Sequence, residues 1–408
     1  MLTRHTHQAL YAAFDRFPSA KGAAVHIARM AHTLFNMVGG GLLYVLGDET
    51  LPAYQEEPGP IEIVRSSSTA PNLLQRTVAY GRYLAALRDQ QAATLRLCHF
   101  RDPWSGIPLL ADPERSYQTI YEVNGLPSLE LPATYPALGP RTLAKIQRLE
   151  THCLTHADAI VTPSTTTRDR LVQMGVAPEN ITVIPNGADI LPTPPRPIHA
   201  PPRYLIYFGA LQPWQGVDVL LRAFALLADY TDLWLVMCIS NPPRSARDYR
   251  KLADKLGISD RMLWLFELPQ DELAPWRAHA LLSVAPLTES VRNVEQGCCP
   301  LKILESMAAG VPVIASDLPA VRELVRDGVD GLLVRPDRPA ALARAVRVLL
   351  DYPHHIPEMG AQARERIASQ FTWQHSTAKL AALYQRMLES GTTHIGARPD
   401  PPADDSTH

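Results

Sequence analysis

The sequence predicts an α/β protein made of two Rossmann-like, doubly wound domains that face each other across a cleft. Its 408 residues suit two domains of about 200 residues better than a single domain. In both halves short apolar runs alternate with amphipathic stretches, which is typical of βαβ units and parallel sheets. The halves are separated by a proline-rich segment, 191–203, that has no apolar periodicity.

The first half, residues 1–190, predicts an N-terminal domain. Ser164 and Gly175 bracket one expected helix as an N-terminal cap and a C-terminal stop signal. The apolar pattern predicts helices over 22–36, 72–90, 138–156 and 164–174. It predicts strands over 8–14, 41–46, 61–64, 94–100, 119–123, 159–162 and 181–185.

The linker 191–203 is expected to be stiff, because proline fixes φ and lacks an amide hydrogen. A C-terminal domain is expected over 204–372, followed by a helix over 373–390. The tail 391–408 is polar and proline-rich, and we expect it to be disordered. The expected strands are 204–209, 233–239, 262–266, 281–286, 311–316 and 331–334. The expected helices are 216–229, 245–256, 270–279, 300–309, 319–326, 337–350 and 356–370.

Composition excludes several classes of function. The net charge of −2 gives no sign of a nucleic-acid-binding protein or of a strongly basic membrane protein. The five cysteines have no CxxC spacing, so neither a disulfide framework nor a zinc site is expected, and a reducing cytoplasm fits. Since no apolar stretch has the length of a membrane span, we expect a cytoplasmic protein. Peripheral association with the inner face of the membrane stays an alternative.

The segment 295–316, EQGCCPLKILESMAAGVPVIAS, carries the most specific pattern. It lies between two expected strands and therefore at the carboxyl end of the first of them. Gly297 permits a tight turn, and Pro300 suits the first turn of a helix. Lys302 and Glu305 are three residues apart, which places them on one face of that helix.

The start of this helix predicts an anion site. Backbone amides around Gly297, Cys298 and Cys299 can bind phosphate oxygens, helped by the positive end of the helix dipole. Lys302 would add a full charge, and Glu305 could accept hydrogen bonds from a ribose. The alternative is a solvated lysine and glutamate on an amphipathic helix, with the cysteines as small buried loop residues rather than reactive thiols.

Four segments together resemble the retaining family-4 glycosyltransferases. Residues 293–334 resemble the donor-site signature of that family, and 157–189 resemble the end of its N-terminal domain. Residues 207–227 resemble the first strand, loop and helix of its C-terminal domain, and 18–34 its first glycine loop and helix. The resemblance covers about residues 8–390, and it implies the GT-B fold and a last helix that crosses back to the first domain.

The sequence departs from this family at its phosphate-binding positions. The family signature has two glutamates separated by seven residues, and Glu305 matches the second, but Gly297 stands at the first. The usual arginine and lysine of the first C-terminal-domain loop match Ala210 and Gln215. Two interpretations follow: a branch in which Lys302 takes over phosphate neutralisation, which we favour, or a homologue that has lost catalysis.

The resemblance implies a donor site in the C-terminal domain, with Lys302 at the phosphates, Glu305 at the ribose and the strand end 266–268 near the base. Lys302 and Glu305 are the residues expected to act in the reaction. The full set of expected donor-site residues is Gly209, Gln215, Phe266, Glu267, Leu268, Gly297, Cys298, Cys299, Pro300, Leu301, Lys302 and Glu305.

The acceptor side is expected at strand ends of the N-terminal domain, where the segments 98–110 and 121–132 are expected to include loops over the cleft. Lys21 and Gly22 resemble a loop that closes over the donor phosphates, with an ordinary turn as the alternative. For the other candidates, His99 among them, a loop-capping hydrogen bond is the alternative to a ligand contact. The acceptor-side residues are Lys21, Gly22, Arg101, Asp102, Glu122 and Asn124.

The implied reaction is transfer of a sugar from a nucleotide-sugar, with retention of configuration, to a glycan, a lipid-linked glycan or a small-molecule hydroxyl. The resemblance implies no metal and no other cofactor, and no nucleic-acid partner is expected. Two alternatives stay open: a catalytically silent nucleotide-sugar-binding homologue, and a nucleotide-sugar epimerase of the same fold.

Overall fold

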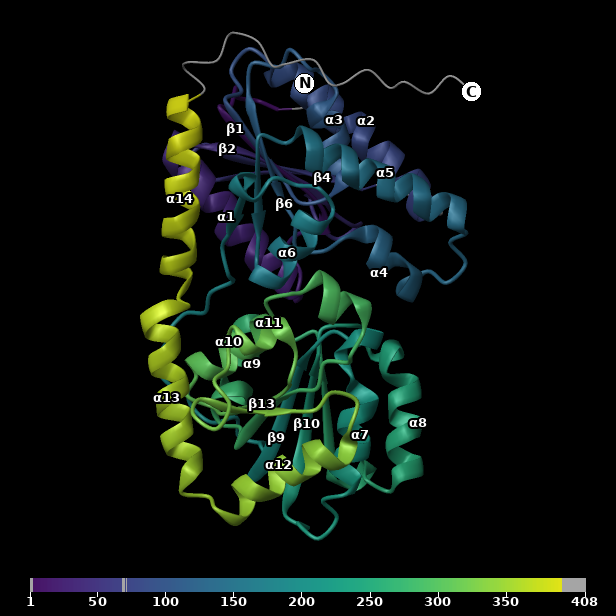
Figure 1. Cartoon of the computed structure of the whole chain (residues 1–408), viewed down its shortest axis with the longest axis vertical. Helices are drawn as coiled ribbons and strands as arrows, with labels where there is room; N and C mark the ends of the chain where they lie inside the picture. Colours follow the sequence, from purple (N-terminus) through teal and green to yellow (C-terminus); the bar gives the residue numbers. More distant parts are fainter. Residues whose placement is uncertain (1–2, 68–69, 71, 391–408) are drawn as a thin grey trace.

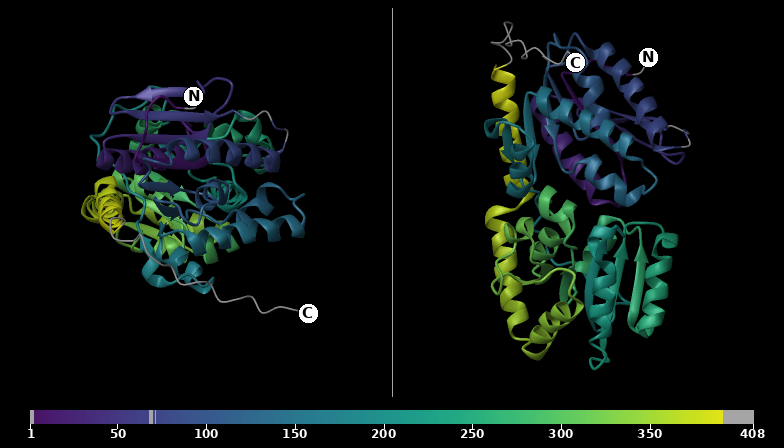
Figure 2. Two further views of the ribbon diagram at one scale, coloured as in Figure 1. Left: turned by 90° about the horizontal axis from the view of Figure 1, so that it is seen from above. Right: turned by 45° about the vertical axis from the view of Figure 1, so that its right-hand side comes forward.

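The computed structural model describes residues 3–390 except 68–69 and 71, and it confirms the two doubly wound α/β domains (Figure 1). The expected tail 391–408 lies outside the described residues. The domains are stacked end to end, and the two last helices run along one side of both of them (Figures 1 and 2).

The N-terminal sheet has eight strands in the order β3-β4-β2-β1-β5-β6-β7-β8, all parallel except the β3–β4 pair. Its strands are β1 (Ala9–Arg16), β2 (Gly41–Leu46), β3 (Tyr54–Glu57), β4 (Ile61–Ser66), β5 (Leu97–Phe100), β6 (Gln118–Glu122), β7 (Ala159–Thr162) and β8 (Ile181–Val183). Its helices are α1 (Gly22–Val38), α2 (Leu73–Gln91), α3 (Pro103–Leu110), α4 (Pro127–Thr134), α5 (Pro140–His156) and α6 (Thr165–Gln173).

The C-terminal sheet has six parallel strands in the order β11-β10-β9-β12-β13-β14. Its strands are β9 (Arg203–Gly209), β10 (Leu233–Ile239), β11 (Met262–Phe266), β12 (Leu282–Ala285), β13 (Val313–Ser316) and β14 (Gly331–Val334). Its helices are α7 (Val217–Ala225), α8 (Arg247–Leu256), α9 (Gln270–Ala278), α10 (Leu301–Ala308), α11 (Pro319–Arg322), α12 (Pro339–Asp351) and α13 (His355–Gln370); α14 (Trp373–Ser390) ends the described chain.

Apart from the edge strand β3, the strands of both sheets are largely buried, which is why most of them read as apolar runs. In β1, Tyr11 and Ala13 pack against α1 and α14, whereas Leu10 and Ala12 pack against α2, α3 and α5. Helix α14 belongs to the N-terminal core, because its Tyr384 is fully buried there and its hydroxyl lies 2.6 Å from His99 Nδ1. The chain thus returns to its first domain, which fixes how the two domains face each other.

Two expected loops are helices instead. The segment after β5 forms α3, which is capped by the carboxylate of Asp102, and the segment after β6 forms α4. The expectation of loops in these two segments was therefore wrong. In both helices a proline occupies the first position, where the missing amide hydrogen costs nothing.

Candidate active site

A cleft of about 350 Å³ lies between the domains and brings together most of the residues singled out in the sequence. The C-terminal wall is formed by the ends of β9 and β10, by the loop after β11, by the loop before α10 and by the first turns of α10. The N-terminal wall is formed by the start of α1 and the ends of β5 and β6. The expected residues that line the cleft are Lys21, Gly22, Arg101, Asn124, Gly209, Gln215, Leu268, Cys298, Cys299, Pro300, Leu301, Lys302 and Glu305.

Lys302 is a buried cation with neutral partners. Only 8% of the residue is exposed, its ammonium donates to Gln215 Oε1 at 2.5 Å, and Nζ lies 4.1 Å from the centre of the Tyr207 ring. No carboxylate of the described residues pairs with it. Burial lowers the pKa of Lys302 to about 7; Cys298 makes a smaller contribution that raises the pKa, and Arg292 one that lowers it further. An anion at the cleft would therefore meet a cation whose charge is not already compensated.

Glu305, one turn further along α10, is already paired. Its Oε2 accepts from Arg277 Nη1 at 3.1 Å, and both side chains are largely buried. Burial raises the pKa of Glu305, and Arg277 opposes that shift. The guanidinium of Arg277 in turn lies 5.7 Å from the centre of the Phe208 ring, so a residue of α9 fixes the orientation of the carboxylate.

Gly297 packs closely against the start of α6 in the N-terminal domain. Its φ is +80°, and a Cβ atom would lie 2.9 Å from both Ser164 Oγ and Thr166 Cβ of the N-terminal domain. Glu323 of the C-terminal domain accepts hydrogen bonds from the amides and hydroxyls of Thr165 and Thr166. The start of α6 therefore occupies the space that a larger residue at position 297 would need.

A buried glutamate organises the N-terminal wall. Glu122, 1% exposed, accepts from Tyr11 Oη at 2.7 Å and from Arg101 Nε at 2.8 Å, and His99 Nε2 lies 3.0 Å from it. Burial would raise the pKa of Glu122, but Arg101 and the two nearby histidines hold it well below its usual range. The second histidine, His26, lines the cleft, and burial lowers its pKa to about 4, so it is neutral near pH 7.

Five expected site residues do not line the cleft: Asp102, Glu122, Phe266, Glu267 and Gly297. Asp102 caps α3 and accepts from the amides of Phe14 and Ser105, so its carboxylate is committed to local structure. Glu122 lies behind Arg101 and Asn124 and holds both of them. The backbone of Glu267 has a positive φ of 51°, and the next residue, Leu268, reaches the cleft.

Several cleft residues escaped the sequence analysis. Trp214 and Arg292 line the C-terminal wall, and His26 and Asn186 line the N-terminal side. Arg292 belongs to a turn of π-helix, Arg292–Gln296, whose sequence carries no periodic signal. Burial raises the pKa of the Cys298 and Cys299 thiols that line the wall, which disfavours their nucleophilic thiolate forms.

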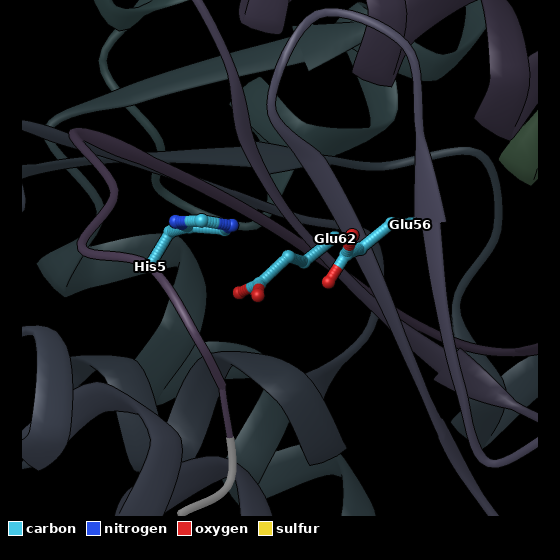
Figure 3. Close-up of side chains that lie close together, drawn as sticks. All are labelled: His5, Glu56 and Glu62. Atoms are coloured by element: carbon cyan, nitrogen blue, oxygen red, sulfur yellow. The ribbon is translucent and has the colours of Figure 1, made fainter.

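One group among the described residues has the composition of a metal site, and it lies in the N-terminal domain at strands β3 and β4. Ligand atoms of His5, Glu56 and Glu62 lie within 4.8 Å of one another (Figure 3). However, the two carboxylates already accept hydrogen bonds from Arg4 and Tyr54. The group is separate from the cleft, whose lining includes none of its members.

Comparison with known proteins agrees with this arrangement. Residues 20–190 match the model of glycosyltransferase family 4, and residues 202–352 match that of glycosyl transferases group 1. A D-inositol 3-phosphate glycosyltransferase of Thermobispora bispora is 32% identical over 317 residues, which are 73% of this chain and 69% of that protein. An MMP alpha-(1->4)-mannosyltransferase of Mycolicibacterium hassiacum is 30% identical over 232 residues, which are 57% of this chain and 54% of that protein.

Solved structures show the same fold at low sequence identity. Sucrose-phosphate synthase from Thermosynechococcus elongatus superposes with a TM-score of 0.76 at 18% identity, covering 94% of this chain and all of that one. HepE of Anabaena, solved with UDP and glucose, gives a TM-score of 0.71 at 16% identity over 93% of this chain and all of its own. With two family models matched in order and a relative covered over two thirds of its length, the chain belongs to family 4 of the glycosyltransferases and has the GT-B fold.

Proposed function

We propose that this chain transfers a sugar from a nucleoside-diphosphate sugar to an acceptor hydroxyl with retention of the anomeric configuration. The observation that carries the proposal is Lys302, a buried ammonium that faces the cleft with only a neutral amide and an aromatic ring as partners. Burying a cation without a counter-ion is costly, and such sites are typical of anion binding. The departing diphosphate is the anion that this position suits.

In the proposed reaction the bond between the anomeric carbon and the diphosphate oxygen breaks, and its electron pair leaves with the nucleoside diphosphate. The acceptor oxygen bonds to the anomeric carbon from the same face, and its proton passes to the departing phosphate. Lys302 stabilises the growing negative charge, and amides around Cys298 and Cys299 contribute hydrogen bonds. Glu305, oriented by Arg277, accepts from the ribose hydroxyls. Because these groups provide the charge, we propose that the reaction needs no metal ion and no other cofactor.

The acceptor is proposed to be a hydroxyl of a glycan, a lipid-linked glycan or a small polyol. Two relatives are named for transfer to inositol phosphate and for mannosyl transfer, which favours a hydroxyl-rich acceptor. Among the described residues, no helix combines the length and the apolar character that crossing a bilayer requires.

The test uses purified full-length chain with UDP, GDP and ADP sugars, in the presence of a metal chelator. Binding is first measured by thermal shift, since a ligand that binds only the folded state raises its apparent stability. Structural neighbours were solved with UDP-glucose and with ADP, so both bases belong in the panel. Acceptor-dependent release of nucleotide, with an NMR assignment of the product anomer, would support the proposal.

Three outcomes would contradict it. Nucleotide release without any acceptor together with an epimerised sugar would identify an epimerase. Nucleotide binding without turnover over a broad acceptor panel would identify a silent homologue. An inverted anomer in the product would refute retention while leaving the transfer itself intact.

A further inference from the structure

The C-terminal wall, which the proposed function assigns to the donor diphosphate, has fewer charges than that ligand calls for. Ala210 and Gln215 occupy the positions at which the resembled family has an arginine and a lysine. Gln215 contributes only an amide oxygen, which Lys302 uses. A diphosphate diester carries more than one negative charge, so Lys302 alone leaves part of it uncompensated. Binding of the diphosphate therefore calls for a second cation on this wall.

Arg292 is that cation. It lines the cleft from the turn that precedes the Cys298–Cys299 loop, and its guanidinium lies 5.3 Å from the centre of the Trp214 ring, another cleft residue. Its Nη1 donates to Asn293 Oδ1 at 3.1 Å. The positive charge of Arg292 repels that of Lys302 and so helps to lower the pKa of Lys302. Two like charges thus share one wall, an arrangement that an anion between them would relieve.

The counter-ion of Arg292 comes from the opposite domain. Arg292 Nε lies 3.1 Å from Glu130 Oε1, which also accepts from Gln296 Nε2 at 2.8 Å, and Gln296 Oε1 accepts from the amide of Leu126. The side chain of Glu130 is 29% exposed, so this ion pair is only partly withdrawn from water. The Arg292 side chain is 19% exposed, and its guanidinium has five N–H donors, so it can bind a second anion beside Glu130.

We propose that Arg292 is a second donor-binding cation, which contacts the diphosphate oxygens together with Lys302 and replaces the charges missing at positions 210 and 215. The residue type suits this role because a planar guanidinium binds two oxygens at once, and the Trp214 ring lies beneath it. Unlike Lys302, whose pKa is about 7, Arg292 remains charged throughout the neutral pH range. The two cations therefore differ in role: Arg292 provides a constant positive charge, whereas a bound anion favours the protonated, charged form of Lys302.

The test is isothermal titration calorimetry on the full chain near neutral pH with UDP, GDP and ADP. The nucleotide that wild type binds most tightly is then compared with its own nucleoside, which lacks the phosphates. The variants are R292Q, which removes the charge, R292K, which keeps it, and E130Q, which removes the counter-ion but leaves Arg292. We expect R292Q to lower the affinity for the nucleoside diphosphate by about tenfold or more and to leave the affinity for the nucleoside unchanged. R292K should recover part of the loss, and E130Q should bind the diphosphate at least as tightly as wild type.

Each result decides between the possibilities. If R292Q binds the diphosphate like wild type, Arg292 is not a donor-binding residue, although the proposed function stands. If R292Q and E130Q lower the affinities for the diphosphate and for the nucleoside equally, Arg292 only holds the two domains together, and the inference is wrong. If wild type binds none of the nucleotides, the proposed function fails, and the inference that rests on it fails too. An unchanged nucleoside affinity also shows that the variants are folded.

Discussion

Replacing Lys302 by methionine should stabilise the protein and at the same time abolish donor binding. The pKa of Lys302 is lowered by burial from 10.5 to about 7, so folding is opposed by the cost of keeping this ammonium charged. At about 1.36 kcal/mol for each pH unit, the difference corresponds to an upper limit of about 5 kcal/mol. Methionine fills a similar volume and gives up one hydrogen bond to Gln215 and the contact with the Tyr207 ring. A net gain of about 1–3 kcal/mol is therefore expected, once about 1 kcal/mol for each lost contact is subtracted.

The sign of the pH dependence follows from the same shift. The pKa of a base is lower in the folded state, so the penalty is fully present below about pH 7 and fades as the pH rises toward 10.5. The gain of the Lys302→Met variant over wild type should thus shrink by about 2 kcal/mol between neutral pH and about pH 9, which removes most of it.

The assay is urea unfolding of both proteins across this pH range without ligand, followed by calorimetry with a nucleoside diphosphate. Lys255→Met is the control, because Lys255 is exposed on α8 and away from the cleft, and it should change stability by less than about 0.5 kcal/mol. The reasoning would be refuted if Lys302→Met were less stable than wild type at neutral pH, or if the difference did not vary with pH. Undiminished nucleotide affinity would refute the phosphate assignment separately.

Three further variants test the contacts that shape the cleft. Gly297→Ala should lose about 1–3 kcal/mol of stability, because its Cβ would lie 2.9 Å from Ser164 Oγ at a φ of +80°; an unchanged urea midpoint would mean that this contact does not persist in solution. Glu122→Gln should cost about 3 kcal/mol in thermal unfolding, since it leaves the buried Arg101 with only the half-exposed Asp15 as its charge partner, and a loss below about 0.5 kcal/mol would contradict that role. Glu323→Gln, which weakens a contact between the domains, should increase the radius of gyration in small-angle scattering with little change in unfolding; no change in the radius would show that other contacts hold the cleft closed.

Much of the fold could be predicted because parallel strands buried on both faces leave an unambiguous signal. The expected strands 233–239, 262–266 and 331–334 coincide with β10, β11 and β14. Strand β3 was not predicted, because its sequence YQEE is charged and pairs antiparallel at the sheet edge, where polar residues are tolerated. β3 can be assigned only from its pairing with the neighbouring strand β4, and a local sequence pattern carries no information about that pairing.

The candidate site was predictable only where its residues are local in sequence. Lys302 and Glu305 could be placed because one helix turn separates them. Their partners could not: Gln215 is 87 residues from Lys302, and Arg277 is 28 residues from Glu305. The ion-pair partner of Arg292 is Glu130, which is 162 residues away in the other domain. This contact forms only when the two domains face each other.

The two walls of the cleft differ in charge, and this difference suggests which ligand each of them binds. On the N-terminal wall, apart from the exposed Lys21 at the start of α1, the charge of Glu122 is matched by Arg101, and the cleft-lining His26 is neutral near pH 7. On the C-terminal wall Lys302 has no counter-ion among the described residues, and that of Arg292 is partly exposed. An ionic ligand gains most where charge is uncompensated, and neutral hydroxyls gain most from uncharged hydrogen-bonding groups. We therefore expect the diphosphate on the C-terminal wall and the acceptor hydroxyl opposite it. A His26→Ala substitution should then raise the KM for the acceptor and leave nucleotide affinity unchanged, and a loss of nucleotide affinity instead would refute this division.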